Sequence, residues 1–160
     1  MEIEVLNDGT TEFRQVPDFL LEMLKEVPAL AASDDPRVEA RFFPSPVAAD
    51  ARDVLSEDWS AYVQPELQAS FLEARETIQA DLRSARKDGA LWTIRIPLNH
   101  ADAWLHALNQ ARLAIAAAND FGEDDLSADL PAQVSSEREQ ALLRMHFYGM
   151  VQEWFVRFLD

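Results

Sequence analysis

The stretch WLHALNQARLAIAAANDFG, residues Trp104 to Gly122, decides the fold. Its Trp, Leu, Ala and Ile side chains recur at the spacing of an α-helix, which predicts a buried helix that ends near Asn119. At about 100° per residue, four side chains fall within about 40° of Trp104 and mark the buried side: Leu108, Ala111, Ile115 and Ala118. His106 and Gln110 fall on the opposite side, which we expect to face water.

Three polar side chains lie on the flank of that buried side: Asn109, Arg112 and Asn119. A guanidinium there must reach water or find acceptors, because an unpaired buried charge is costly. On a structural interpretation, Arg112 is mostly shielded and pairs with a carboxylate or with helix-end carbonyls, which joins two elements. On a functional interpretation, Arg112 and Asn109 present donors to an anionic ligand or to a partner's carboxylate. We expect the structural interpretation to hold.

Working outward toward the N-terminus, Asn7-Asp8-Gly9 separates two β-prone runs and predicts a hairpin. A helix is expected from Pro17 to Pro28. Its buried side should carry Phe19, Leu20, Met23, Leu24 and Val27. Residues 31–50 hold three prolines and are expected to be irregular, with a short extended piece where Val38, Ala40 and Phe42 alternate with charged residues.

A second helix is expected from about Ser56 to Lys87, with Pro65 as a break or a first turn and Gly89 as the C-cap. One narrow apolar stripe runs along it: Leu67, Phe71, Ala74, Ile78, Leu82 and Ala85. The segment LWTIRIP, residues 91–97, is β-prone and could pair with the hairpin. Asn99 and Asp102 are expected to cap the helix that contains Trp104.

An acidic, turn-rich loop is expected over residues 120–134, followed by a last helix from the capping box Ser136–Glu139 to Leu159. The apolar face of that helix is broad: Leu143, Phe147, Met150, Val151, Trp154 and Phe158. These side chains are expected to form part of the core. The alternative is that some of them form part of a homodimer interface.

These patterns predict a mainly α protein: a single helical-bundle domain over residues 1–160 with a small N-terminal β-hairpin. The hairpin occupies 1–16, the α-rich body 17–160 and the acidic loop 120–134, and a short strand near 91–96 could join the hairpin. Cysteine is absent, which excludes disulfides and thiolate metal sites. We also expect no membrane-spanning segment and no signal peptide, and hence a cytoplasmic protein.

The net charge of −15 arises from 29 acidic against 14 basic residues, and it disfavours binding to nucleic acid. No phosphate loop, dinucleotide fingerprint or nucleophile elbow occurs. The spacing of the histidines and of the acidic loop does not match a metal site, so no cofactor and no metal is expected. An enzyme is therefore less expected than a binding protein.

Three segments resemble a bacterial family known as domain-of-unknown-function family twenty-seventeen. They are WLHALNQARL (residues 104–113), ARFFP (40–44), and Gly149 followed by Gln152-Glu153. The order and spacing agree over roughly residues 38 to 160. The chain departs from the family pattern at Asn109-Gln110, where an Asn-Asp pair is expected, and at AAAND after Ile115, where a Gly-Thr-Arg type of ending is expected.

The resemblance implies no established activity. In some bacteria the members look like neighbours of the Clp protease adaptor, which implies protein–protein contacts and an accessory role in Clp-type regulated proteolysis. That is the function we expect, with a protein partner of unknown identity. The alternative is a small anionic-ligand binder or enzyme with a pocket around Arg112 and Asn109. The candidate binding residues are Arg41, Asn109, Arg112 and Glu153.

Overall fold

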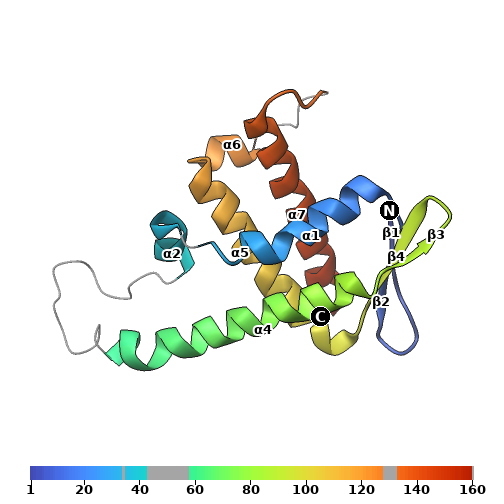
Figure 1. The fold of residues 1–160 in the computed structure, drawn as a ribbon, viewed down its shortest axis with the longest axis horizontal. Coiled ribbons are helices and arrows are strands. Elements are labelled where there is room, and N and C mark those ends of the chain that lie inside the picture. Colours follow the sequence, from blue (N-terminus) through green and yellow to red (C-terminus); the bar gives the residue numbers. More distant parts are fainter. Residues whose placement is uncertain (34, 43–57, 128–132, 160) are drawn as a thin grey trace.

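The computed structural model describes residues 1–33, 35–42, 58–127 and 133–159. The protein is mainly helical with one small antiparallel sheet (Figure 1). The strands are β1 (Glu2–Val5), β2 (Thr11–Val16), β3 (Arg86–Asp88) and β4 (Leu91–Ile96). The α-helices are α1 (Asp18–Leu30), α2 (Pro36–Phe42), α4 (Gln64–Arg83), α5 (Ala101–Ala118), α6 (Glu123–Ser127) and α7 (Glu137–Leu159). A π-helical turn at Trp59–Val63 precedes α4, and a 3₁₀ turn at Leu98–His100 precedes α5.

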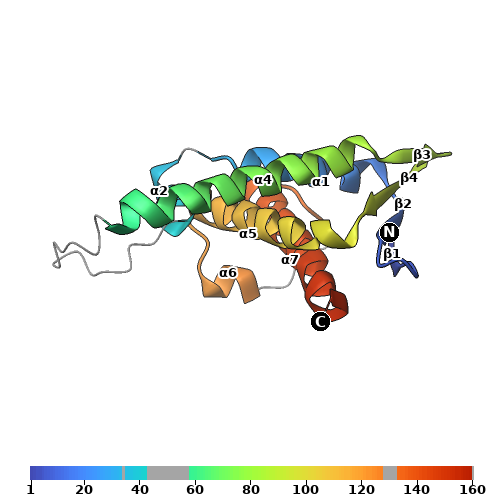
Figure 2. The same ribbon diagram turned by 90° about the horizontal axis from the view of Figure 1, so that it is seen from below.

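Helix α5 contains most of the stretch from Trp104 to Gly122, and it lies at the centre of the fold. Helices α1, α2, α4 and α7 all contact it. Figure 2 shows α1 and α4 on one side of α5, with α6 and the C-terminal end of α7 on the other. In the described part of the chain, no helix is long and apolar enough to cross a membrane.

The N-terminal hairpin is confirmed. β1 and β2 pair in antiparallel register, with Glu2 opposite Arg14. Gly9 takes the positive φ of +81° that a tight turn requires, and the Asp8 carboxylate accepts the backbone N–H of Thr10 at 2.9 Å. The predicted joining strand is also present, because β4 pairs with β2 and places Ile96 opposite Thr11.

The sheet holds a strand that the sequence did not predict. β3 occupies residues 86–88, of which the helical pattern predicts the first two as the end of a helix. The strand order is β1-β2-β4-β3. α4 ends at Arg83, and Gly89, with a φ of +62°, is part of the turn between β3 and β4. The expected C-cap at Gly89 is therefore wrong, since pairing with β4 outweighs the helical preference of these residues.

Two predictions for α1 are wrong. Pro28 does not end the helix, which continues to Leu30, because the backbone N–H of Ala31 still reaches the carbonyl of Val27 at 2.9 Å. Phe19 is 62% exposed and lies away from the core. The remaining predicted apolar residues of this helix are buried or half-buried: Leu20, Met23, Leu24 and Val27.

The expected extended piece at 38–42 is a helix instead. Asp35 accepts the backbone N–H of Arg37 at 2.9 Å and so caps α2, with Pro36 in its first turn. Val38 is buried against Ala114 and Ala117 of α5. Predictions for residues 43–57 lie outside the described residues. The acidic loop contains a short helix, α6, and its residues 128–132 also lie outside the described part.

Helix α5 begins differently from the prediction and buries more of its surface. The chain enters it through a 3₁₀ turn, so Asn99 does not cap it and no side-chain cap is made. Trp104, Leu108, Ala111 and Ile115 are buried as predicted, whereas Ala118 is exposed. Gln110 was expected to face water and is only 2% exposed, because α2 and α4 cover that side of the helix.

The N-terminus of α7 confirms the capping box. Glu139 accepts the backbone N–H of Ser136 at 2.9 Å, and Ser136 Oγ accepts the N–H of Glu139 at 3.2 Å. The hydrogen bonds that the Glu139 carboxylate accepts from Ser135, together with the one from the N–H of Ser136, lower the pKa of Glu139 to about 2. On the apolar face, Phe147 and Val151 are buried, but Met150 is 49% exposed and not part of the core.

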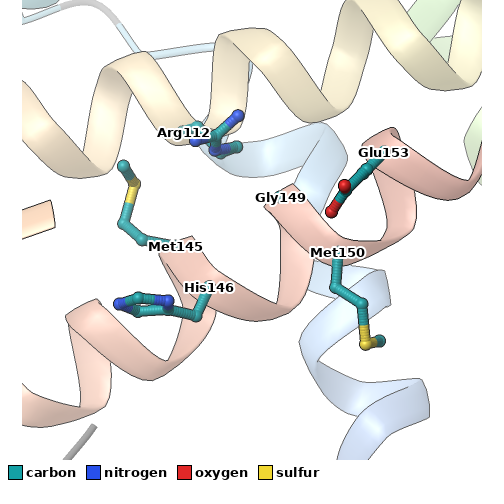
Figure 3. A pocket seen from close by; sticks show the side chains of 6 residues that line it. All are labelled: Arg112, Met145, His146, Gly149, Met150 and Glu153. Carbon is teal, nitrogen blue, oxygen red and sulfur yellow. The ribbon is translucent and has the colours of Figure 1, made fainter. Parts of the chain in front are cut away.

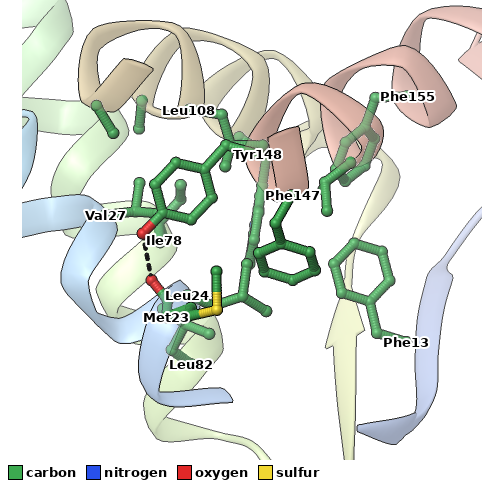
Figure 4. Close-up of a cluster of buried hydrophobic side chains, with 14 of the residues drawn as sticks. Phe13, Met23, Leu24, Val27, Ile78, Leu82, Leu108, Phe147, Tyr148 and Phe155 are labelled. Carbon is green, nitrogen blue, oxygen red and sulfur yellow. Dashed lines mark hydrogen bonds between the residues drawn. The ribbon is translucent and has the colours of Figure 1, made fainter. Parts of the chain in front are cut away.

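The core lies where α1, α4, α5, α7 and the sheet meet (Figure 4). Its largest fully buried side chains include Trp104, Tyr148, Phe13 and Phe155. The Tyr148 hydroxyl donates to the carbonyl of Met23 at 2.5 Å, which ties α7 to α1 and satisfies the only polar atom of that side chain. Burial raises the pKa of Tyr148.

A buried carboxylate joins α4 to the start of α5. Asp81 is 6% exposed and accepts the indole N–H of Trp104 at 2.9 Å. Its carboxylate also lies 3.0 Å from Nδ1 of His100. A buried carboxylate is stable only when such partners replace its hydration, so these three side chains form one unit.

We predict that Asp81→Asn lowers the free energy of unfolding by about 1–3 kcal/mol, because the charged acceptor is lost and one amide N–H then faces other donors. Chemical denaturation monitored by tryptophan fluorescence measures the change. Asp102→Asn, at an exposed position of α5, is the matched control and should have little effect. Equal stability of Asp81→Asn and wild type would contradict this account.

Candidate functional site

The candidate site is built around Arg112, which projects from α5 toward α7 (Figure 3). The guanidinium lies against α7 at Gly149, where a Cβ would stand 3.5 Å from Arg112 Cζ, an ordinary van der Waals contact. α5 and α7 pack against each other, so the side chain lies in their interface and is half-buried.

The partner of Arg112 is an amide and not a carboxylate. Arg112 Nη1 donates to Oε1 of Gln152 at 2.7 Å, and Gln152 Nε2 donates in turn to the carbonyl of Leu105 at 3.2 Å. Arg112 Nε is buried and has no hydrogen-bond partner in the part of the chain that the structure describes. Among the described residues, no carboxylate oxygen lies within 4.0 Å of this guanidinium. The predicted carboxylate pair is therefore wrong.

Burial without a counter-charge has an electrostatic consequence. Desolvation lowers the pKa of Arg112, and no ion pair with the described residues opposes that shift. By contrast, Arg144 of α7 makes an ion pair with Glu26 at 2.5 Å, and its pKa is raised. The surroundings of Arg112 thus offset only part of the cost of burying its charge.

A groove of about 410 Å³ opens beside the guanidinium. Its lining residues are Arg112, Met145, His146, Gly149, Met150 and Glu153. Apart from Arg112, all of them come from α7, where residues three and four apart share one face. The carboxylate of Glu153 is 62% exposed and pairs with Arg157 one turn later. The groove thus presents one desolvated cation, one solvated anion, one imidazole and two thioether side chains.

The structure brings together two of the four candidate residues, Arg112 and Glu153. Asn109 is exposed on α5 and does not line the groove. Arg41 lies in α2, but its side chain lies outside the described residues. The amide of Asn119 donates to the carbonyl of Ile115 at 2.9 Å and so completes the end of α5.

Sequence reasoning missed the role of Gln152 and the two methionines of the groove. Gly149 lies beside the guanidinium and was identified only as part of a family motif. Gln152 lies three residues further on, on the same face, and was identified only as part of a family motif. Which face of α7 meets α5 could not be read from the sequence.

The groove contains a cation that can bind an anion, together with His146 and Glu153. A guanidinium of this kind can hold a carboxylate through charge-assisted hydrogen bonds. The lining contains no serine, threonine or cysteine that could act as a nucleophile. In the part of the chain that the structure describes, no group of three or more metal-ligating side chains is placed to hold a metal ion.

The chain belongs to the family described as Domain of unknown function (DUF2017), which it matches over residues 1–159. The match includes the N-terminal hairpin as well as the helical part. No curated protein and no solved structure matches the chain.

We predict that Gln152→Ala lowers the free energy of unfolding by about 1–3 kcal/mol, because Arg112 Nη1 loses its acceptor inside the helix interface. The exposed Gln140 lies on the same helix, and Gln140→Ala is the matched control. Urea denaturation of the two variants measures the difference. If both variants unfold at the same urea concentration, Gln152 does not support Arg112.

Proposed function

We propose that this protein is a non-catalytic binding protein and that the groove at Arg112 holds a carboxylate of a small ligand. The observation that carries the proposal is the half-buried Arg112 guanidinium, which has an amide partner but no carboxylate partner among the described residues. A structural arginine in a helix interface is usually stabilised by an anion. The missing anion is what a ligand would supply.

The energetic argument favours a ligand over a purely structural role. Gln152 offers Arg112 only a dipole, which offsets part of the desolvation cost of the charge. A carboxylate in the groove would make a hydrogen bond to a charged donor, which is worth about twice a neutral one. Retaining a cation at some cost in stability is common where the cation serves binding.

The other lining residues suggest the class of ligand. Glu153 lies in the same groove and would repel a second negative charge, so a ligand with one carboxylate fits better than a dicarboxylate. An amino group directed toward Glu153 would find a favourable charge there. Met145 and Met150 offer flexible apolar contacts for the carbon chain between the two groups. A small zwitterion, such as an amino acid, combines these features.

We predict that 4-aminobutyrate binds in the groove and that Arg112→Met weakens the binding at least tenfold. Titration followed by amide resonances should shift those of Gly149 and its neighbours, with smaller shifts for succinate and for butylamine. Arg112→Met should be as stable as the wild type or more stable, because it removes a desolvated charge and keeps the side-chain volume.

The control for this experiment is Arg37→Met, which replaces an exposed arginine of α2 and should leave binding unchanged. Two outcomes would contradict the proposal. One is unchanged binding of 4-aminobutyrate by Arg112→Met. The other is a loss of more than about 2 kcal/mol of stability in that variant, the size expected when a structural ion is removed.

A second candidate function is a protein contact, with this chain as an accessory in Clp-type regulated proteolysis in the cytoplasm. Two observations favour a protein partner. The net charge of −15 would attract a partner with a basic surface. On α7 the apolar side chains of Met150 and Val156 are 49% and 54% exposed. Met150 also lines the Arg112 groove, so a partner and a ligand could meet at α7.

For this second function we predict that a purified Clp adaptor or Clp ATPase, from a bacterium that carries this protein, binds it and dissociates as salt is raised. The acidic surface supplies the attraction, which salt screens. Surface plasmon resonance at low and high ionic strength measures the change. A double variant of α7, Met150→Ser with Val156→Ser, should bind more weakly, and the exposed Leu72→Ser of α4 is the control. Absence of binding at low salt would reject the candidate.

A further inference from the structure

His146 lines the Arg112 groove, and the proposed function gives it no role. Its side chain is half-buried on α7. Within the described residues, neither of its ring nitrogens makes a hydrogen bond or an ion pair. A neutral imidazole carries one donor and one acceptor. Besides Arg112, the groove therefore holds a second group whose hydrogen-bonding capacity the described part of the protein does not use.

The spacing along α7 fixes the order of the polar groups in the groove. His146 and Glu153 are seven residues apart, which is two helical turns, so they share one face and lie about 10 Å apart along the helix axis. Gly149 lies between them, and a Cβ there would stand 3.5 Å from Arg112 Cζ. Figure 3 shows the same order, with Arg112 between the imidazole and the carboxylate. The guanidinium thus lies in the middle of the groove and not at one end.

A guanidinium in the middle constrains the shape of the ligand. In the proposed function, on which this inference rests, Arg112 holds the carboxylate of the ligand. The rest of the ligand can then extend toward Glu153, toward His146 or toward both. An α-amino acid extends both ways, because its ammonium group and its side chain leave the same carbon atom beside the carboxylate. The linear 4-aminobutyrate carries its carboxylate at one end and fills only the half toward Glu153.

The half of the groove toward Glu153 can accept the ammonium group. Glu153 pairs with Arg157, but these side chains are 62% and 69% exposed, and an exposed pair of this kind contributes little to stability. A carboxylate also has about four lone-pair sites, so Glu153 can accept a further hydrogen bond without losing Arg157. In Figure 3 the Glu153 carboxylate points back toward Gly149 and the middle of the groove.

A neutral hydrogen-bonding group fits the half toward His146. From Gly149 to His146 the helix rises about 4.5 Å, which a side chain of a few bonds can span. A second anion in the groove would be repelled by Glu153, and a second cation would be repelled by Arg112. A primary amide carries both donors and an acceptor, so it can pair with either tautomer of the imidazole.

We infer that the ligand of the Arg112 groove is an α-amino acid with an uncharged amide at the end of its side chain. Its carboxylate lies on Arg112, its ammonium group is directed toward Glu153, and its amide pairs with His146. Arg112 holds the part that all amino acids share. His146 contacts the part that differs between them, and it is therefore the residue that determines specificity.

L-Glutamine is the probe, and L-norleucine, whose unbranched side chain is apolar, is the comparison. Isothermal titration calorimetry should show about fivefold tighter binding of L-glutamine, the effect of one net hydrogen bond. His146→Leu should remove this preference and leave the Kd of 4-aminobutyrate unchanged. In NMR spectra of the wild type, L-glutamine should shift the ring nitrogen resonances of His146 more than L-norleucine does.

The control variant is His106→Leu, at an exposed position of α5 outside this groove, and it should keep the preference for L-glutamine. Equal Kd values for L-glutamine and L-norleucine, with 4-aminobutyrate still bound, would overturn the inference and leave the proposed function intact. A His146→Leu variant that still prefers L-glutamine would overturn it as well. Binding of none of the three compounds would overturn the inference and the proposed function together.

Discussion

The constraint on which the rest of the structure depends is the enclosure of α5. Four helices contact it, so the polar side chains that it buries must find their partners inside the protein. Trp104 finds a carboxylate, Asp81, and this contact fixes α4 against the start of α5. Arg112 finds only the amide of Gln152. Gln110 finds no hydrogen-bond partner for either side-chain atom within the described ranges, and the structure offers no physical account of it.

Trp104 and Arg112 differ in how fully the protein satisfies their hydrogen-bond donors. The indole needs one acceptor and has it, so its role in the fold is complete. The guanidinium carries a full charge and several donors. Among the described residues the helix interface gives it one neutral acceptor and leaves Nε unpaired. A fold that needed only stability would be served as well by an apolar side chain at this position. This uncompensated charge is the basis of our proposal that a ligand in the groove supplies the anion.

Features with a local cause could be predicted from the sequence, and features set by packing partners could not. The turn at Gly9 and the capping box of Ser136 and Glu139 follow from hydrogen bonds within a few residues, and both are present. Family membership also followed from short motifs. Burial of Gln110 depends on α2 and α4, which the helical pattern of α5 does not encode. The helical pattern of α5 placed Arg112 correctly on the flank of the buried side. It did not predict the partner of Arg112, Gln152, because that residue belongs to α7.

The most direct test of the central claim is the side-chain N–H resonance of Arg112 Nε, observed by NMR in the ligand-free protein and during titration with acetate. A guanidinium without a carboxylate partner should move downfield as acetate occupies the groove, and its hydrogen exchange should slow. The account predicts both changes at Arg112, with no change at Arg144, which already has a carboxylate. An Arg112 resonance that already coincides with that of a carboxylate-paired arginine, and that stays fixed as acetate is added, would contradict the account.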